Sequence, residues 1–397
     1  MESRVYLDHA ATTPLDGRVR DALVSHLGEP RANPSSLHGL GTAAREVVEE
    51  AREAVARLTG ASPREILFTG GGTESDALAV LGLARAAVAA DPARRHLVVS
   101  AVEHSAVRKA AEHLESTGYR VTWLGVDGHG LVDPRELSQA LRPETALAAV
   151  MWANNEVGTV QPVEELARVC REQEVPFHCD AVQAVGHLPV DVTEVPVSTL
   201  AFTGHKFYGP SGVGALYVRD GVELAPVSFG GGQERGLRSG TEDVAGIAAL
   251  GAAARLAAGE REEWARRERE LRDRLVRGAT AIPGVELNGH PAERLPNNAH
   301  LAVEGVEAES LVLFCDASGY AIGKGSACAS AGEPAGGEHK ASPVLAAMGQ
   351  DERRAFSAVR VTVGKDNTPE EIDGFLEAFS GAVAQLRELS PLYAGRG

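Results

Sequence analysis

Two residues of this 397-residue chain could act together in catalysis, because each lies at or just after the end of a strand-like apolar run. Lys206 lies in a glycine-bounded segment, 203–210, and Asp180 ends the run 177–180. A lysine amine can form a Schiff base, which a guanidinium cannot, and only five of the 39 basic residues are lysines. A carboxylate such as Asp180 can hold the pyridine nitrogen of pyridoxal 5'-phosphate (PLP) protonated. Either residue by itself is more often a surface or turn residue, so this pair is a hypothesis that other residues must support.

Further polar residues follow strand-like runs in the same way. Ligands of open α/β sheets bind beyond the carboxyl ends of the strands. The glycine-rich segment 70–73 is expected to lead into a helix that Thr73 caps, with free backbone N–H groups able to hold a phosphate. The other strand ends carry Glu103 and His104, Asn154 and Asn155, Asp180 with Gln183, and Lys206. We therefore predict that these residues meet in one site.

Alternating strand-like and helical patterns must position these residues. The alternation predicts an α/β sheet, mainly parallel, covered by helices on both faces. A long helical pattern from about residue 243 to 280 separates this unit from a smaller α+β unit with predicted helices near 309–315 and 369–389. The predicted strands of the larger unit are 66–69, 97–100, 121–124, 147–152, 177–180, 200–203 and 213–218, and those of the smaller unit are 285–287, 300–303 and 359–363.

Composition excludes several classes of protein. The formal charge of −16, with no block of basic residues free of acids, argues against a nucleic-acid binder. The first residues lack an apolar core of signal-peptide length, and no run approaches the length of a membrane span. We therefore expect a cytoplasmic protein that makes no membrane contact.

The four cysteines suggest neither a metal site nor a disulfide framework, because no Cys-x-x-Cys pair or zinc-like histidine spacing occurs. Cys170, Cys179 and Cys315 lie in regular apolar patterns and are expected to be buried. Cys328 differs, because Gly, Ser and Ala residues surround it and nothing nearby would bury it. From its local sequence, a functional and a structural role for Cys328 stay equally open.

With these residues assembled, the chain resembles the cysteine desulfurases of the NifS/IscS kind, a branch of the class V aminotransferase-like PLP enzymes. The resemblance runs nearly from end to end of the chain. The segments that carry it are 6–14, 33–38, 68–76, 153–159, 180–183, 204–206, 230–242 and 325–328.

The resemblance implies the fold of the PLP-dependent transferases, the aspartate aminotransferase-like fold type I. It implies a large PLP-binding domain over residues 16–258 and a small domain made of 1–15 and 259–397, which carries the catalytic cysteine loop. It also implies a homodimer that uses L-cysteine as substrate and passes sulfur to an acceptor protein.

The resemblance further implies a role for each candidate residue. Lys206 would hold PLP as a Schiff base and move the substrate Cα proton, while the Cys328 thiolate would attack the substrate sulfur, giving an enzyme persulfide and alanine. Asp180 would pair with the pyridine nitrogen, Gln183 with the phenolic oxygen, and His104 would stack on the ring. The remaining residues would bind the cofactor phosphate (Gly72, Thr73, Thr203, His205 and, from the neighbouring subunit, Thr241) or the substrate carboxylate (Asn155 and Arg360).

Two departures from the family pattern occur. Thr203 stands where most relatives have Ser, which keeps the hydroxyl, and the segment after Cys328, 332–345, is several residues longer than expected. Selenocysteine lyase, or another class V PLP lyase or aminotransferase, stays open as an alternative activity. A non-enzymatic scaffold for sulfur-carrier proteins is a third interpretation, which the presence of all the expected catalytic residues disfavours.

Overall fold

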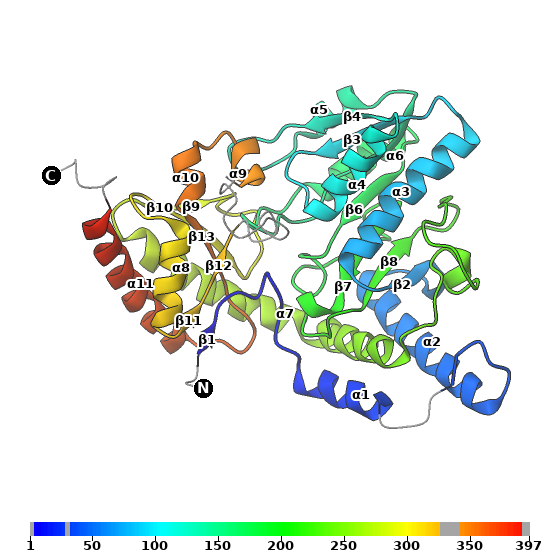
Figure 1. Ribbon diagram of the computed structural model, residues 1–397, viewed down its shortest axis with the longest axis horizontal. Coiled ribbons are helices and arrows are strands. Elements are labelled where there is room, and N and C mark those ends of the chain that lie inside the picture. The colour runs from blue at the N-terminus through cyan, green and yellow to red at the C-terminus, as the bar shows by residue number, and fades with distance from the viewer. Residues whose placement is uncertain (1–3, 28–31, 326–341, 391–397) are drawn as a thin grey trace.

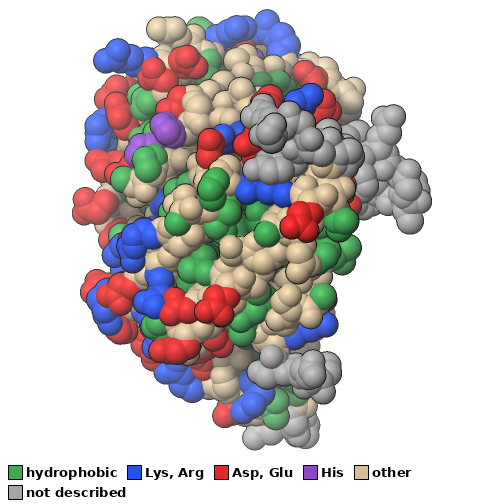
Figure 2. Space-filling model, turned by 90° about the vertical axis from the view of Figure 1, so that its left-hand side faces the viewer, with side chains coloured by type: hydrophobic (Ala, Val, Ile, Leu, Met, Phe, Trp, Pro, Cys, Tyr) green, Lys and Arg blue, Asp and Glu red, His purple; other side chains and the backbone are tan. Residues whose placement is uncertain are grey.

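The computed structural model describes residues 4–27, 32–325 and 342–390. They form a seven-stranded sheet flanked by helices and a smaller four-stranded sheet, and helix α7 (Val244–Thr280) runs between the two (Figure 1). None of the helices in these ranges combines the length and the hydropathy needed to cross a bilayer. On the face shown in Figure 2, acidic and basic side chains are interspersed.

The large sheet has the strand order β2-β8-β7-β6-β5-β3-β4. All neighbours are parallel except β8, which runs antiparallel to both β2 and β7. The strands are β2 (Ile66–Thr69), β3 (His96–Ser100), β4 (Arg120–Leu124), β5 (Thr145–Ala149), β6 (Phe177–Asp180), β7 (Thr199–Thr203) and β8 (Gly214–Val218). This confirms the prediction of a mainly parallel α/β sheet.

Two details differ from the sequence prediction. The reversal of β8 was not foreseen; it follows from the short connection 204–213, since a parallel return needs a crossover of a dozen residues or more. The strand predicted at 147–152 is β5, which lies two residues earlier and ends at Ala149. Residues 150–152 are not part of the assigned strand, although the N–H groups of Val150 and Trp152 still donate to the carbonyls of His178 and Asp180 in β6. They carry the chain into the segment that holds Asn154 and Asn155.

Helices cover both faces of the large sheet because its central strands are buried on both sides. In β7, Leu200 and Phe202 pack into the cluster that contains α2 and the first half of α7, whereas Ala201 points into the opposite cluster with α3 and α4. This alternation is the period of two expected of a strand. The helices of this unit are α1 (Gly17–Leu27), α2 (Gly39–Thr59), α3 (Gly72–Ala90), α4 (Ser105–Ser116), α5 (Pro134–Ala140) and α6 (Val163–Glu172).

The smaller sheet is antiparallel, with the order β12-β13-β10-β9. The second half of α7 packs against it together with α8 and α11, so that Leu275, Leu301 and Phe375 share one apolar cluster. The elements of this unit are β9 (Val285–Asn288), β10 (Asn298–Val303), α8 (Ala308–Ala317), β12 (Gly323–Lys324), α9 (Pro343–Ala347), α10 (Glu352–Phe356), β13 (Ala358–Thr362) and α11 (Pro369–Leu389). The domain boundaries given above stay a prediction.

The N-terminal segment connects the two units. Strand β1 (Val5–Tyr6) pairs in parallel with β11 (Tyr320–Ala321), beside the smaller sheet. The chain then crosses to the large sheet, where Thr13 donates its backbone N–H to the carbonyl of His205. Residues 8–13 therefore lie between β13 and the segment that carries Lys206.

Candidate active site

Lys206 lies in the 3-10 turn Gly204–Lys206, immediately after the central strand β7. Its Nζ donates to the carbonyl oxygens of Ala10 at 2.6 Å and Ala11 at 2.8 Å. The turn is tight, since a Cβ on Gly209 would lie 2.8 Å from the Gly204 carbonyl oxygen. A buried strand and a sterically closed turn thus hold the amine against the N-terminal segment.

Asp180 ends β6, the parallel neighbour of β7, with Asp180 opposite Ala201. Its Oδ1 accepts a 2.9 Å hydrogen bond from the Val182 N–H, and the residue is 4% exposed. Burial raises the pKa of Asp180, while the charge of His104 opposes that rise. A buried carboxyl that readily shares a proton suits a partner such as the ring nitrogen of a pyridine.

His104 and Asp76 lie next to Asp180. A ring nitrogen of His104 and one oxygen from each aspartate lie within 4.8 Å of one another. His104 is the N-cap of α4, and its Nδ1 accepts from the Ala106 N–H at 3.2 Å. The ends of β3 and β6 thus bring His104 and Asp180 together. Two carboxyls and an imidazole could also ligate a metal ion, which the sequence did not indicate.

The glycine-rich turn differs from its prediction in one respect. Thr73 is not the helix cap: Gly71, with φ 147° and ψ −178°, is the N-cap of α3 and supplies no side-chain hydrogen bond. Only glycine adopts that conformation readily, so the helix begins at Gly72 and Thr73 is its second residue. The first backbone N–H groups of α3 thus lack a side-chain cap, which suits an anion such as a phosphate.

Of the residues expected around a phosphate, Thr203 lies against this helix start. A Cβ on Gly72 would lie 2.7 Å from Val182 Cγ2 and 3.7 Å from Thr203 Cγ2, so the turn packs directly on the ends of β6 and β7. The Thr203 hydroxyl donates to the Val213 carbonyl at 2.9 Å. Burial and the charge of Lys206 lower the pKa of His205 to about 4, so its imidazole is neutral at pH 7.

Gln183 also reaches this site. Its Nε2 donates to the Ala10 carbonyl at 3.0 Å, and Lys206 Nζ donates to the same oxygen. Thr241 is exposed just before α7, and no contact found in the described ranges joins it to Lys206. Arg238 nearby forms a 2.8 Å ion pair with Glu74, in the first turn of α3.

Arg360 and Asn155 lie on the other side of the N-terminal segment. Arg360, on β13, donates at 2.8 Å both to the Asn155 carbonyl and to Asp8 Oδ1. It is 4% exposed, and its Nε finds no hydrogen-bond partner in the described part of the chain. A buried guanidinium with a free donor is equipped to take a carboxylate. The buried side chain of Asn154 accepts from the Glu156 N–H at 2.9 Å and so fixes the turn that presents Asn155.

Cys328 lies outside the described residues, as does most of the predicted extended segment after it. Cys170, Cys179 and Cys315 are all fully buried, which confirms their prediction. Burial raises the pKa of the Cys170 and Cys315 thiols to about 12. These three thiols are therefore poor nucleophiles at neutral pH.

Sequence reasoning did not assign roles to several residues of the site. Asp8 pairs with Arg360, and Glu103 is buried with its Oε2 unpartnered among the described residues. Asp76 lies beside Asp180, and its Oδ1 is 3.2 Å from Nε2 of the buried His178. Asp76 lies one turn after Gly72, and that spacing was a usable signal. The pairing of Asp8 with Arg360 had no local signal, because 352 positions separate them.

Glu103 gives the cofactor-free protein an unusual pH dependence. Burial, and then the charge of Asp180, raise its pKa from 4.5 to about 8. The folded state therefore binds the proton more tightly than the unfolded state, so stability falls as pH rises from about 4.5 to 8. We expect Glu103→Gln, measured by urea unfolding, to reduce that fall by up to about 1.4 kcal/mol per pH unit. An unchanged slope would show that Glu103 is already ionised in the folded protein.

The chain is similar to a known protein family, to characterised relatives and to solved structures. The family model described as aminotransferase class-V matches residues 5–375. The cysteine desulfurase IscS of Methanosarcina thermophila is 43% identical over 389 residues, covering 98% of this chain and 94% of the relative. A solved NifS-like protein superposes with a TM-score of 0.89 at 35% identity, over 96% of this chain and 100% of the other. The structure described as SspA in complex with cysteine superposes with a TM-score of 0.78 at 34% identity, over 91% of this chain and 99% of the other.

Proposed function

We propose the function of this chain from its family. The chain belongs to the class V aminotransferases, whose members depend on PLP. It is a cysteine desulfurase that converts L-cysteine to L-alanine and a persulfide on Cys328, as its 43% identity to a cysteine desulfurase over nearly the whole chain supports. The observation that carries the proposal is the placement of the Lys206 amine and the Asp180 carboxyl at the ends of neighbouring strands β7 and β6, beside an uncapped helix start.

The residues present fit PLP. Asp180 would pair with the pyridine nitrogen, His104 would stack on the ring, and Gln183 would reach the phenolic oxygen. When bound, PLP supplies a carbonyl that takes the substrate amine and a protonated ring that withdraws electrons from the substrate Cα. The start of α3 would take the phosphate, and the residues that would hold it are Gly72, Thr73, Thr203, His205 and, from the second subunit, Thr241.

Lys206 would move a proton at the substrate Cα, because its amine is the base that the site supplies there. The carbonyls of Ala10 and Ala11, which accept from Nζ, hold the amine on this side of the site. Arg360 and Asn155 hold the substrate carboxylate. To do so, Arg360 exchanges Asp8 for the substrate, a swap of one carboxylate for another that leaves its charge compensated.

Cys328 completes the reaction. Its thiolate attacks the substrate sulfur, a sulfur–sulfur bond forms as the carbon–sulfur bond breaks, and the released electron pair stays on the carbon, which a proton then converts to alanine. The persulfide sulfur passes to an acceptor protein that serves iron–sulfur cluster assembly or the thiolation of tRNA or cofactors. The protein acts in the cytoplasm.

The proposal is tested by adding L-cysteine and a reductant to the PLP-loaded protein and measuring alanine and sulfide together. Equal yields are expected. A plain aminotransferase would remove the amino group and keep the carbon–sulfur bond, so it would form neither alanine nor sulfide. A strong preference for selenocysteine over cysteine would favour the alternative, selenocysteine lyase.

Thr241 provides a separate prediction for the homodimer. Its exposed hydroxyl follows the glycine-rich segment 230–240, which allows a close backbone approach across an interface. Loss of one hydrogen bond to a charged phosphate costs about 1.5–3 kcal/mol. Thr241→Ala should therefore weaken PLP binding at least about tenfold while the dimer stays intact, as measured by fluorescence titration and light scattering. A fully active monomer, or unchanged PLP affinity in this variant, would contradict the prediction.

A further inference from the structure

A buried chain of polar contacts leads to the backbone carbonyl of Lys206. His187 and Glu268 are 3% and 0% exposed. His187 Nε2 lies 3.0 Å from the carbonyl oxygen of Lys206, and its Nδ1 lies 3.2 Å from Glu268 Oε2. Glu268 comes from α7, between Trp264, which packs in the core of the large sheet, and Leu271, which packs in the core of the smaller one. These contacts connect the long helix to the backbone of Lys206 itself.

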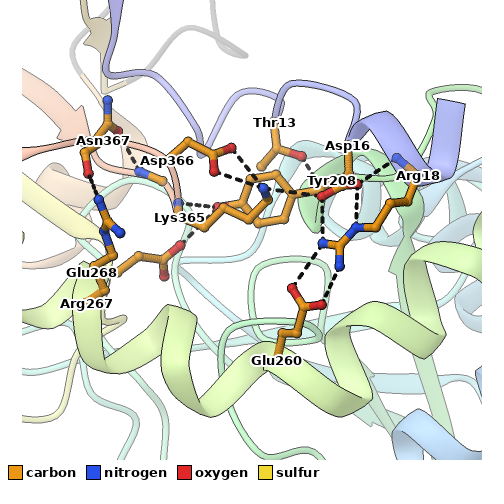
Figure 3. Close-up of polar contacts among 11 residues, drawn as sticks. Thr13, Asp16, Arg18, Tyr208, Glu260, Arg267, Glu268, Lys365, Asp366 and Asn367 are labelled. Carbon is orange, nitrogen blue, oxygen red and sulfur yellow. Dashed lines mark hydrogen bonds and ion pairs between the residues drawn. The ribbon is translucent and has the colours of Figure 1, made fainter.

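The partners of His187 determine its protonation. The Lys206 carbonyl can only accept, so Nε2 must donate. Glu268 Oε1 accepts from the Tyr208 hydroxyl at 3.0 Å, and that hydroxyl in turn accepts from the Lys365 N–H at 2.7 Å (Figure 3). Because the Tyr208 hydroxyl gives its one proton to Oε1, Oε2 of Glu268 can accept a proton from Nδ1 of His187. An imidazole that donates from both ring nitrogens carries a positive charge.

The surrounding backbone leaves this cation little freedom. Gly186 has φ 90°, and a Cβ on it would lie 2.2 Å from the Cβ of Phe207. Tyr208 adopts φ 66°, which is uncommon for a residue with a side chain, and its N–H donates to the Thr13 hydroxyl at 2.7 Å. The turns that carry His187 and Lys206 are therefore pressed together, with the imidazole bridging them.

We propose that His187, kept charged by Glu268, is a positioning residue that holds the Lys206 backbone in place and directs positive charge toward the Lys206 amine. The inference rests on the proposed function, because it assigns Lys206 the proton transfer. His187 touches neither substrate nor cofactor in this account. It acts through Lys206, by donating to its carbonyl and by repelling an extra proton on its amine.

The charges around His187 agree with this assignment. Burial lowers the pKa of His187, but the charge and hydrogen bond of Glu268 outweigh it, so the pKa lies above its usual value even though the Lys206 ammonium opposes this. The titratable groups that face His187 are Glu268, Tyr208, Lys206 and His9. Burial lowers the pKa of His9 to about 4, with the charge of His187 contributing, so His9 is neutral at pH 7.

A nuclear magnetic resonance measurement tests the charge directly. In the full chain labelled with ¹⁵N at histidine, two protonated ring nitrogens are expected for His187 at pH 7.5, with and without PLP. The signal is assigned by its loss in His187→Gln. A neutral His187 ring at that pH would overturn the proposal, and this outcome does not depend on whether the protein desulfurates cysteine.

Variants test the effect on Lys206. Removing the cation should raise the pH midpoint of the Schiff-base absorbance of the PLP-loaded protein by about one unit and lower kcat about tenfold, with KM for cysteine changed less than twofold. His187→Gln leaves Glu268 without a charged partner, so the double variant with Glu268→Gln is measured as well and should shift the midpoint in the same direction. His187→Lys, which restores a cation able to donate to both partners, should return the midpoint to its original value.

A merely structural role makes a different prediction. It would lower the unfolding temperature of the variants and leave the midpoint where it is, and this result would overturn the proposal. Failure of the proposed function is distinguishable, because a protein without desulfurase activity would still show the charged ring and the shifted midpoint.

Discussion

Lys206→Ala is expected to lower alanine formation by a factor on the order of 10⁴ or more and to remove the visible absorbance of the Schiff base. The structure gives the physical reason. The amine lies at the end of β7 with Nζ against two backbone carbonyls, so the Schiff base and the proton transfer both depend on this one side chain. The measurement is alanine release together with the absorbance spectrum of the purified, PLP-loaded variant.

Two control variants sharpen this result. Lys206→Arg keeps a positive charge but cannot form the Schiff base, and it should be as inactive as the alanine variant. Lys109→Ala removes an exposed lysine of α4 that pairs with Glu112, and it should leave both activity and colour unchanged. Normal turnover in Lys206→Ala would show that Lys206 does not have the assigned role.

Cys328→Ser is expected to bind PLP and cysteine normally, yet to form no persulfide and almost no alanine. A hydroxyl is a far weaker nucleophile than a thiolate toward sulfur, so loss of turnover by a factor of about 10³ or more follows. The measurement is mass spectrometry of the protein after a brief exposure to cysteine, with alanine quantified in the same sample.

The other cysteines supply matched controls. Cys170, Cys179 and Cys315 each lie at 0% exposure in an apolar cluster. Replacing any one of them with Ala should cost stability, at about 1 kcal/mol, while activity is largely kept. A parent-like rate in Cys328→Ser, or strong inactivation by one of the three control changes without loss of folding, would contradict the assignment.

Much of the fold was predictable because its signals are local. The strands of the large sheet are short and apolar on both faces. The observed boundaries of β2, β6 and β7 lie within one or two residues of the predicted ones. The helix predicted at 243–280 is α7. The wrong assignment of the cap to Thr73 arose because a glycine in an unusual conformation, Gly71, can begin a helix without any side-chain cap.

The parts of the site that sequence did not predict depend on distant contacts. Asp8 meets Arg360, and Glu268 meets His187, only because the N-terminal segment and α7 both cross between the two sheets. A periodic pattern reports which face of an element is apolar; it carries no information about which polar residues of two elements will meet. The sequence likewise cannot show that Glu268 is buried, because α7 carries many other acidic and basic residues and only the packing around each one distinguishes them.

The central claim is that Cys328 receives the sulfur of cysteine in a reaction that Lys206 makes possible. A single-turnover experiment tests it most directly: the PLP-loaded protein is mixed with cysteine carrying labelled sulfur, without reductant, and the modified residue is mapped by peptide mass spectrometry. The account predicts about one alanine and one labelled persulfide per active subunit, with the label on Cys328 and none in the Lys206→Ala variant. Label on Cys170, Cys179 or Cys315, or alanine formed without any protein-bound label, would contradict it.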